Sequence, residues 1–280
     1  MSGQRMRIAL CNEVVRDLPF AQQCELAASL GYDGLEIAPF TLGTEPHLLP
    51  ASDRAAARRA AADAGIAICG LHWLLVAPAG LSITTDDVAI RARSLDVMRG
   101  LVDLAADLGA GVLVHGSPGQ RELPDGAGAV QARQRGTDMF AAIGEVATRT
   151  GLTYCIEPLA STDTQFVTTV EEAVGIVRAI NLPGLKTMID CSAARTESLS
   201  VPDLIDRYLP TGLISHIHFN DPNRRGPGQG ALALAPVLDA LRRQAFAGWT
   251  GVEPFDYVPD GPGSAARAIG YLRGIEEALS

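Results

Sequence analysis

Two glutamates occur in the same local pattern, in which a short apolar run ends in Glu-Pro. They are Glu157 in YCIEPL and Glu253 in TGVEPF. A proline forces the preceding residue into the extended region and cannot donate to a β ladder, so each glutamate is expected at the last position of a strand. One such glutamate would most simply open an exposed loop. The repeat at two predicted strands makes this interpretation weaker and favours two carboxylates that point into one common site.

Further ionisable side chains stand at the ends of other apolar runs. Asp190 ends LKTMID, and His216 and His218 lie two residues apart in LISHIHF, which places both on one face of a strand. His218 comes later and is expected at the strand end, whereas His216 is expected one layer down with a hydrogen-bond partner. The remaining ionisable residues at predicted strand ends are Glu36, His72 and His115.

A shared target explains this concentration of ionisable groups. Such groups cost several kcal/mol in an apolar interior unless they are paired or bind a metal. Three carboxylates and one imidazole make an oxygen-rich ligand set that suits Mn²⁺ or Mg²⁺ best and is compatible with Co²⁺, Zn²⁺ or Fe²⁺. An octahedral ion would keep two positions for a chelating 1,2-hydroxycarbonyl. The predicted ligands are Glu157, Asp190, His218 and Glu253.

The scaffold must bring these distant strand ends together. Short β-rich runs alternate with amphipathic helical runs along the whole chain, which predicts a (β/α)8 TIM barrel as a single domain over residues 1–280. In such a barrel, functional residues collect at the C-terminal ends of the strands. The predicted strands are 6–11, 33–38, 66–72, 111–117, 152–158, 185–190, 213–219 and 250–255. The predicted helices lie near 19–30, 53–64, 85–108, 129–149, 169–180, 201–209, 235–246 and 264–278.

The third predicted helix has the most distinct boundaries. Thr84 or Thr85 is expected as its N-cap, and Gly109 is expected to end it in the left-handed conformation. Several other helices are also followed by a glycine that leads into the next strand, as short connections between a helix and a strand require.

Composition and charge limit the classes of partner. The 280 residues are 47% hydrophobic and 20% charged, with a net charge of −9, so nucleic acid and anionic membranes are not expected partners. No run approaches the ~20 apolar residues of a membrane helix, and MSGQRMRIALCNEV lacks the apolar core of a signal peptide. The five cysteines show no CxxC spacing and are expected as reduced core thiols. A cytoplasmic protein is therefore expected.

The order Glu, Asp, His, Glu at the ends of strands five to eight resembles the xylose isomerase-like sugar isomerase/epimerase superfamily. The motifs IEPL, MID, HIHFNDPNR and VEPF carry this resemblance, and their pattern is most similar to the ketose 3-epimerases that act on D-tagatose and D-psicose. The resemblance implies a divalent ion, usually manganese, held by the four predicted ligands. It also implies that Glu157 and Glu253 face each other across the sugar. One would remove the proton from carbon 3 and the other would return a proton to the opposite face, through a metal-stabilised cis-enediolate.

The resemblance also suggests substrate contacts and contains two departures. Arg224, six residues after His218, matches an arginine that binds substrate oxygens. Where the epimerases have a histidine three residues after the metal aspartate, this chain has Ala193. Where they have a glutamate six residues after the first metal glutamate, it has Asp163. These departures leave the sugar, and the reaction, open.

Four other residues are candidates for contact with a substrate. Glu36 is expected to orient substrate hydroxyls, and Trp73 is expected to form a wall of the pocket. His72 and His115 either contact substrate or are structural histidines with satisfied hydrogen bonds.

The sequence is compatible with several functions on this scaffold. A metal-dependent sugar epimerase or isomerase is favoured, with a small-molecule sugar as partner and a homo-oligomer, dimer or tetramer, implied by the resemblance. A lyase is the main alternative, acting as a dehydratase of keto-inositol or dehydroshikimate or as a C-glycoside deglycosylase. An apurinic-site endonuclease would need a three-metal cluster and a basic groove, which the acidic composition disfavours. A non-catalytic sugar-binding protein is a further alternative.

Overall fold

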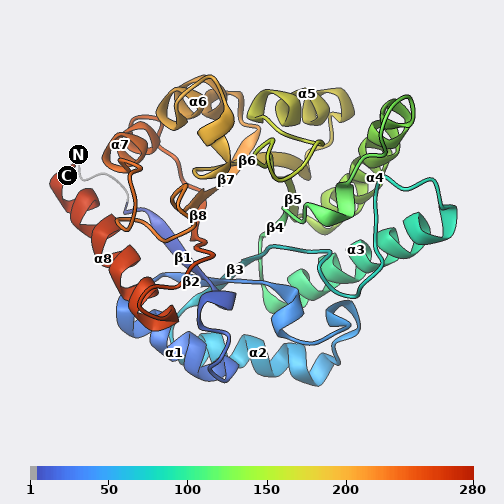
Figure 1. The fold of residues 1–280 in the computed structure, drawn as a ribbon. Coiled ribbons are helices and arrows are strands. Elements are labelled where there is room, and N and C mark those ends of the chain that lie inside the picture. Colours follow the sequence, from blue (N-terminus) through green and yellow to red (C-terminus); the bar gives the residue numbers. More distant parts are fainter. Residues whose placement is uncertain (1–4) are drawn as a thin grey trace.

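Eight parallel strands form a closed barrel in the computed structural model, which describes residues 5–280 (Figure 1). The strands follow one another around the barrel in chain order, and β8 pairs with β1 to close it. The predicted (β/α)8 barrel is therefore confirmed. The strands are β1 (Arg7–Cys11), β2 (Gly34–Ile37), β3 (Ala67–Leu71), β4 (Val112–His115), β5 (Thr153–Ile156), β6 (Leu185–Asp190), β7 (Ile214–Phe219) and β8 (Trp249–Val252).

One α-helix follows each strand and packs outside the barrel, and α8 lies beside α1 where the ring closes (Figure 1). The helices are α1 (Phe20–Leu30), α2 (Ala51–Asp63), α3 (Val88–Leu108), α4 (Gly128–Thr150), α5 (Val170–Ile180), α6 (Val201–Tyr208), α7 (Ala235–Arg243) and α8 (Gly261–Ala278). Short 3₁₀ helices lie in the connections: η1 (Asn12–Val15), η2 (Pro39–Thr41), η3 (Pro46–Leu48), η4 (Gly119–Arg121), η5 (Ala193–Thr196) and η6 (Leu209–Thr211).

Helix α3 begins later than predicted. Its N-cap is Asp87, whose carboxylate accepts hydrogen bonds from the N–H groups of Ala89 and Ile90. The prediction of Thr84 or Thr85 as the cap was wrong, because both residues lie in the preceding loop. Gly109 ends the helix with φ 78°, as predicted, a conformation that side chains other than glycine rarely adopt.

The apolar residues form two layers. The larger cluster lies between the sheet and the surrounding helices, and a small cluster fills part of the barrel interior, where Val112 and Val114 meet Cys155 and Met188. All five cysteines are buried and free, as expected. Within residues 5–280, no helix combines the length and the apolar character that crossing a bilayer requires.

Candidate active site and metal centre

The four predicted metal ligands meet at one end of the barrel. One ligand atom from each of Glu157, Asp190, His218 and Glu253 lies within 4.8 Å of all the others. The glutamates follow β5 and β8 directly, and the other two belong to the ends of β6 and β7. All four are buried, with at most 5% of any one exposed. The parallel barrel thus collects residues that are up to 96 positions apart in the chain.

Nδ1 of His218 points at the three carboxylates. It lies 3.0 Å from Oε2 of Glu253, 3.5 Å from Oε1 of Glu157 and 3.9 Å from Oδ2 of Asp190. A nitrogen and three carboxylate oxygens therefore face one small volume, which is the arrangement that a mixed-ligand metal site requires.

The carboxylate of Asp190 is held by two neighbouring residues. Its Oδ1 accepts a hydrogen bond from the N–H of Ala193, and its Oδ2 accepts one from Nδ2 of Asn220, each at 2.6 Å. Asn220 is itself oriented, because its Oδ1 accepts from the N–H of Ser192. Burial and the negative charges of Glu157 and Glu253 raise the pKa of Asp190 to about 7.

Two glycines make room for the cluster. A Cβ at Gly116 would lie 1.6 Å from Oε2 of Glu157, and a Cβ at Gly251 would lie 2.5 Å from Oε2 of Glu36 and 2.9 Å from the His218 ring. Real Cβ atoms essentially never approach another heavy atom this closely. The absence of a side chain at both positions is therefore a condition for the observed packing.

Glu36 lies beneath His218 and does not line the mouth of the barrel. Its oxygens are 3.3 and 3.4 Å from Nε2 of His218, and Oε2 is 2.9 Å from Nε2 of His216. Burial opposes its ionisation, but the charges of His216 and His218 outweigh burial and hold the pKa of Glu36 well below its usual range. Glu36 thus contacts the rings of His216 and His218 and fixes the orientation of His218, and its contact with a substrate stays a prediction.

His72 bridges two carboxylates, one of which sequence analysis missed. Its Nδ1 is 3.0 Å from Oε1 of Glu253, and its Nε2 is 3.0 Å from Oε2 of Glu13. Glu13 lies in η1, just after β1, where a polar residue in the run CNEVV was a signal that could have been noticed. Burial opposes protonation of His72, but Glu13 and Glu253 raise its pKa well above the usual value. Burial also opposes ionisation of Glu253, but His218 and His72 lower its pKa to about 2.

His115 points away from the site. Side chains alternate along β4, and because Val112 and Val114 face the interior, His115 faces the helices. Its Nδ1 is 2.7 Å from the hydroxyl of Tyr154, and its ring packs edge-on against Phe140 of α4. Burial and the nearby Arg121 lower the pKa of His115 to about 3. The orientation of His115 therefore favours the structural alternative over substrate contact, and only its Nδ1 has a hydrogen-bond partner within residues 5–280.

Arg224 and Trp73 lie together at the rim. The guanidinium of Arg224 lies 5.2 Å from the centre of the Phe255 ring, and Trp73 stacks on the same ring with centres 5.8 Å apart. Phe40 adds a third ring beside Trp73. Arg224 is exposed, which leaves its guanidinium accessible above this aromatic wall.

Asp163 is not brought to the cluster. It is exposed in the connection after β5, where its Oδ2 lies 3.8 Å from Nη2 of Arg195. Sequence analysis also missed Arg121 in η4, which is fully buried and donates from Nη1 to the main-chain carbonyl of Glu157 at 2.8 Å. This contact holds the backbone at the Glu-Pro bond.

The buried charges provide a test of whether a cation fits. The connected groups comprise five carboxylates and three imidazoles, so with all of them ionised two negative charges would remain in excess, and the repulsion among the carboxylates contributes to the raised pKa of Asp190. Arg121 adds one positive charge nearby, which still leaves the site negative. A divalent ion would offset the repulsion among the clustered carboxylates, and buried charges of one sign are otherwise costly. The groups are Glu13, Glu36, His72, Glu157, Asp190, His216, His218 and Glu253.

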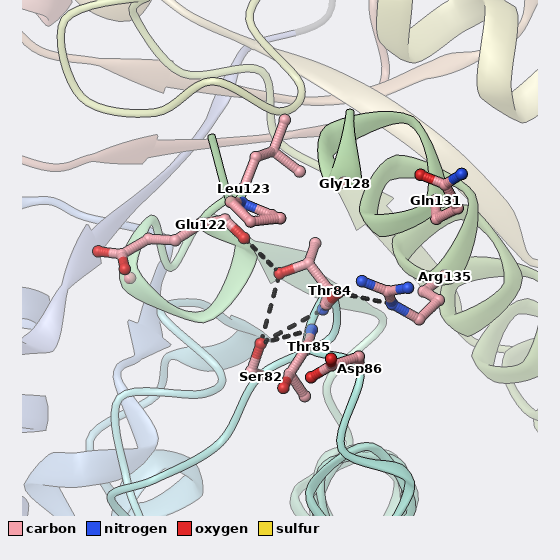
Figure 2. A pocket seen from close by; sticks show the side chains of 11 residues that line it. Ser82, Thr84, Thr85, Asp86, Glu122, Leu123, Gly128, Gln131 and Arg135 are labelled. Atoms are coloured by element: carbon pink, nitrogen blue, oxygen red, sulfur yellow. Dashed lines mark hydrogen bonds between the residues drawn. The ribbon is translucent and has the colours of Figure 1, made fainter. Parts of the chain in front are cut away.

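A separate cavity of about 730 Å³ lies between the loop that precedes α3 and the beginning of α4 (Figure 2). Arg135 crosses its wall and donates from Nε to the carbonyl of Thr84, and Thr84 donates to the carbonyl of Glu122. None of the cluster carboxylates lines this cavity.

The chain has sequence relatives that are named as epimerases and isomerases. A D-psicose 3-epimerase from Agrobacterium fabrum is 29% identical over 84% of this chain and 79% of its own length. A Streptomyces coelicolor protein provisionally named hydroxypyruvate isomerase is 25% identical over 97% of this chain and 96% of its own.

Solved structures share the fold at lower identity. A D-psicose 3-epimerase crystallised in the presence of D-fructose has a TM-score of 0.81 at 21% identity and covers 97% of this chain and 99% of its own. The 3-keto-D-glucoside 4-epimerase of E. coli has a TM-score of 0.81 at 18% identity and covers 96% of this chain and 100% of its own. The family model described as xylose isomerase-like TIM barrel matches residues 24–275. The chain therefore belongs to the xylose isomerase-like TIM barrel family.

Proposed function

We propose that this protein is a divalent-metal-dependent sugar epimerase or isomerase, and more specifically a ketose 3-epimerase. The observation that carries the proposal is the buried cluster in which Glu157 and Glu253 meet Asp190 and His218 within 4.8 Å. Relatives named as ketose 3-epimerases support the same class of substrate.

The two glutamates supply the proton transfers. Each lies at the end of its own strand with its carboxylate in the cluster. The resemblance to the ketose 3-epimerases implies that the sugar lies between them, with one carboxylate on each face of carbon 3. One carboxylate takes the proton from carbon 3, and the other gives a proton to the opposite face, which inverts that carbon. Such positioned proton transfers typically contribute about 10²–10⁴-fold to a rate.

The ion would be held by Glu157, Asp190, His218 and Glu253, with Mn²⁺ as the first candidate for this oxygen-rich set. When bound, it supplies a Lewis acid beside the carbonyl of the substrate and so makes the neighbouring C–H more acidic. The side chains around it keep the ligands in place: Glu36 orients His218, and Asn220 orients Asp190.

The rim residues would bind the sugar. Arg224 offers N–H donors to substrate oxygens, and Trp73 with Phe255 offers an apolar wall to one face of the ring. Asp163 lies outside the ligand cluster beside Arg195, and its contact with substrate oxygens stays a prediction of the resemblance.

A second candidate is isomerisation between carbons 1 and 2 of a small hydroxycarbonyl compound. The Streptomyces relative favours it, and the same carboxylate pair would serve it. A lyase also stays open, because Ala193 stands where ketose 3-epimerases have a substrate-binding histidine. These reactions differ in which carbon exchanges its proton and in whether a leaving group departs.

Incubation of Mn²⁺-loaded protein with a panel of ketoses in D₂O separates these reactions. Deuterium at carbon 3 of a recovered epimer is the expected result. Deuterium at carbon 1 or 2 would assign the isomerase, and loss of water would assign the lyase. The chelated protein serves as the control.

A cytoplasmic location and a homo-oligomer belong to the same proposal as predictions. Cell fractionation tests the first, and light scattering of the purified protein tests the second.

A further inference from the structure

The hydrogen-bonded chain Glu13–His72–Glu253 carries an inference that deepens the proposed function and rests on it. We infer that Glu13 and His72 are positioning residues that hold the carboxylate of Glu253 in its working orientation. Neither residue takes part in the proton transfers or in the ligand set proposed above.

The two oxygens of Glu253 face different partners. Oε2 lies 3.0 Å from Nδ1 of His218 and belongs to the ligand cluster, whereas Oε1 lies 3.0 Å from Nδ1 of His72. A carboxylate turns about its last side-chain bond over a broad, two-fold energy profile. The contact with His72 removes that freedom, because it fixes which oxygen faces the cluster.

Glu13 in turn fixes the orientation of the His72 ring. Its Oε2 lies 3.0 Å from Nε2 of His72, so the imidazole is held at both nitrogens and cannot turn within the barrel. All three side chains are buried, with His72 fully inaccessible and Glu13 6% exposed. In such surroundings hydrogen bonds are electrostatically stronger than in water and reinforce one another along a chain.

The backbone that carries Glu13 is itself anchored. Asn12 donates from Nδ2 to Gln23 of α1 and to Thr41, and its Oδ1 accepts from the N–H of Ala38 just after β2. On the other side, Gly261 packs so closely on η1 that a Cβ there would lie 1.9 Å from the carbonyl oxygen of Val14. Glu13 therefore projects from a rigid support, as a positioning residue requires.

One feature of Glu13 goes against a purely structural role. Within residues 5–280, its Oε1 is buried without a hydrogen-bond partner, although an unpaired buried acceptor costs about 1–3 kcal/mol. An apolar residue would pack in this place at lower cost. The retained carboxylate is explained if its orientation of His72 serves the activity.

The test compares His72→Gln, Glu13→Gln and Glu13→Ala with the wild-type protein, and uses His47→Gln on the outer η3 as the matched control. We expect His72→Gln and Glu13→Ala to lower kcat by about 10- to 100-fold with little change in KM. Mn²⁺ affinity by calorimetry should fall much less than kcat, because all four ligand atoms remain although Glu253 is held less firmly. Glu13→Gln loses less than Glu13→Ala, because its amide oxygen still accepts from His72.

Three results would overturn the inference. They are an unchanged kcat in both His72→Gln and Glu13→Ala, a loss of Mn²⁺ affinity in step with activity, and equal losses for Glu13→Gln and Glu13→Ala. Thermal unfolding of each variant shows whether it is folded.

A readout that needs no substrate separates this inference from the proposed function. In protein labelled with ¹⁵N-histidine, we expect slowly exchanging ring N–H signals of His72 that are lost in Glu13→Ala and kept in His47→Gln. If the His72 ring N–H signals are unchanged in Glu13→Ala, the inference is overturned even if the wild type epimerises ketoses. If the wild-type protein turns over no sugar, the proposed function is wrong. The spectra still show in that case whether Glu13 orders the His72 ring.

Discussion

Gly251 faces the barrel interior between Glu36 and His218, so a single methyl group at this position would press on both. In Gly251→Ala the new Cβ would lie 2.5 Å from Oε2 of Glu36 and 2.9 Å from Cδ2 of His218. Ordinary contact begins at 3.4 Å, so Glu36 would have to move by about 0.9 Å. The backbone cannot retreat, because Gly251 pairs with Ala9 of β1 on one side and with His218 of β7 on the other.

This overlap should lower the stability, the activity and the Mn²⁺ affinity of Gly251→Ala. Overpacking of this kind typically destabilises a protein by about 1–3 kcal/mol. The shift of about 0.9 Å in Glu36 would also displace the His218 ring that it orients, so activity should fall by up to about 100-fold, which a misplacement of this size can cost, and Mn²⁺ binding should weaken. Urea unfolding, calorimetric titration with Mn²⁺ and the rate of proton exchange at carbon 3 measure the three effects.

Gly270→Ala is the matched control. Gly270 lies exposed on α8, and a Cβ there meets nothing within 4 Å. Alanine is the better helix former, so this variant should gain about 0.5–1 kcal/mol and keep full activity. If Gly251→Ala kept the stability, Mn²⁺ affinity and activity of the wild type, the tight packing of Glu36 and His218 around β8 would be refuted.

Three further perturbations test the remaining parts of the site. Glu157→Gln should keep the fold and lower kcat by about 10²-fold or more, because it removes one carboxylate of the proposed acid–base pair. Circular dichroism checks the fold and steady-state kinetics measure kcat. Full turnover by this variant would contradict the role of Glu157. Prolonged chelation should abolish activity, and added Mn²⁺ should restore it. Free Mn²⁺ at 100 times its dissociation constant should raise the free energy of unfolding by about 2.7 kcal/mol. A chelated preparation with full activity would exclude a metal requirement. The five buried cysteines should resist thiol reagents in the native state and react after unfolding. Burial raises the pKa of Cys24 to about 11 and that of Cys11 well above its usual value, which keeps these thiols protonated. Rapid labelling of all five in the native state would contradict their burial.

The sequence by itself determined the order of the elements and the identity of the cluster. Strands and helices leave different apolar periods, and the observed elements lie within a few residues of the predicted ranges. Glu157 and Glu253 were recognisable because proline fixes the residue before it at a strand end. Parallel strands then bring their C-terminal ends to one face of a closed barrel, so that residues remote in the chain could be grouped without coordinates.

Only the tertiary structure decided which way each side chain faces and what lies behind it. Sequence position placed His115 and His72 alike at strand ends, but His115 faces the helices and His72 faces Glu253. Glu36 lies one layer below the mouth, in contact with His218 of β7. Glu13 was not foreseen because it belongs to a connection, where no period marks its direction, and its partner is 59 positions away. Such contacts depend on strand register and packing between distant segments, which one-dimensional patterns do not record.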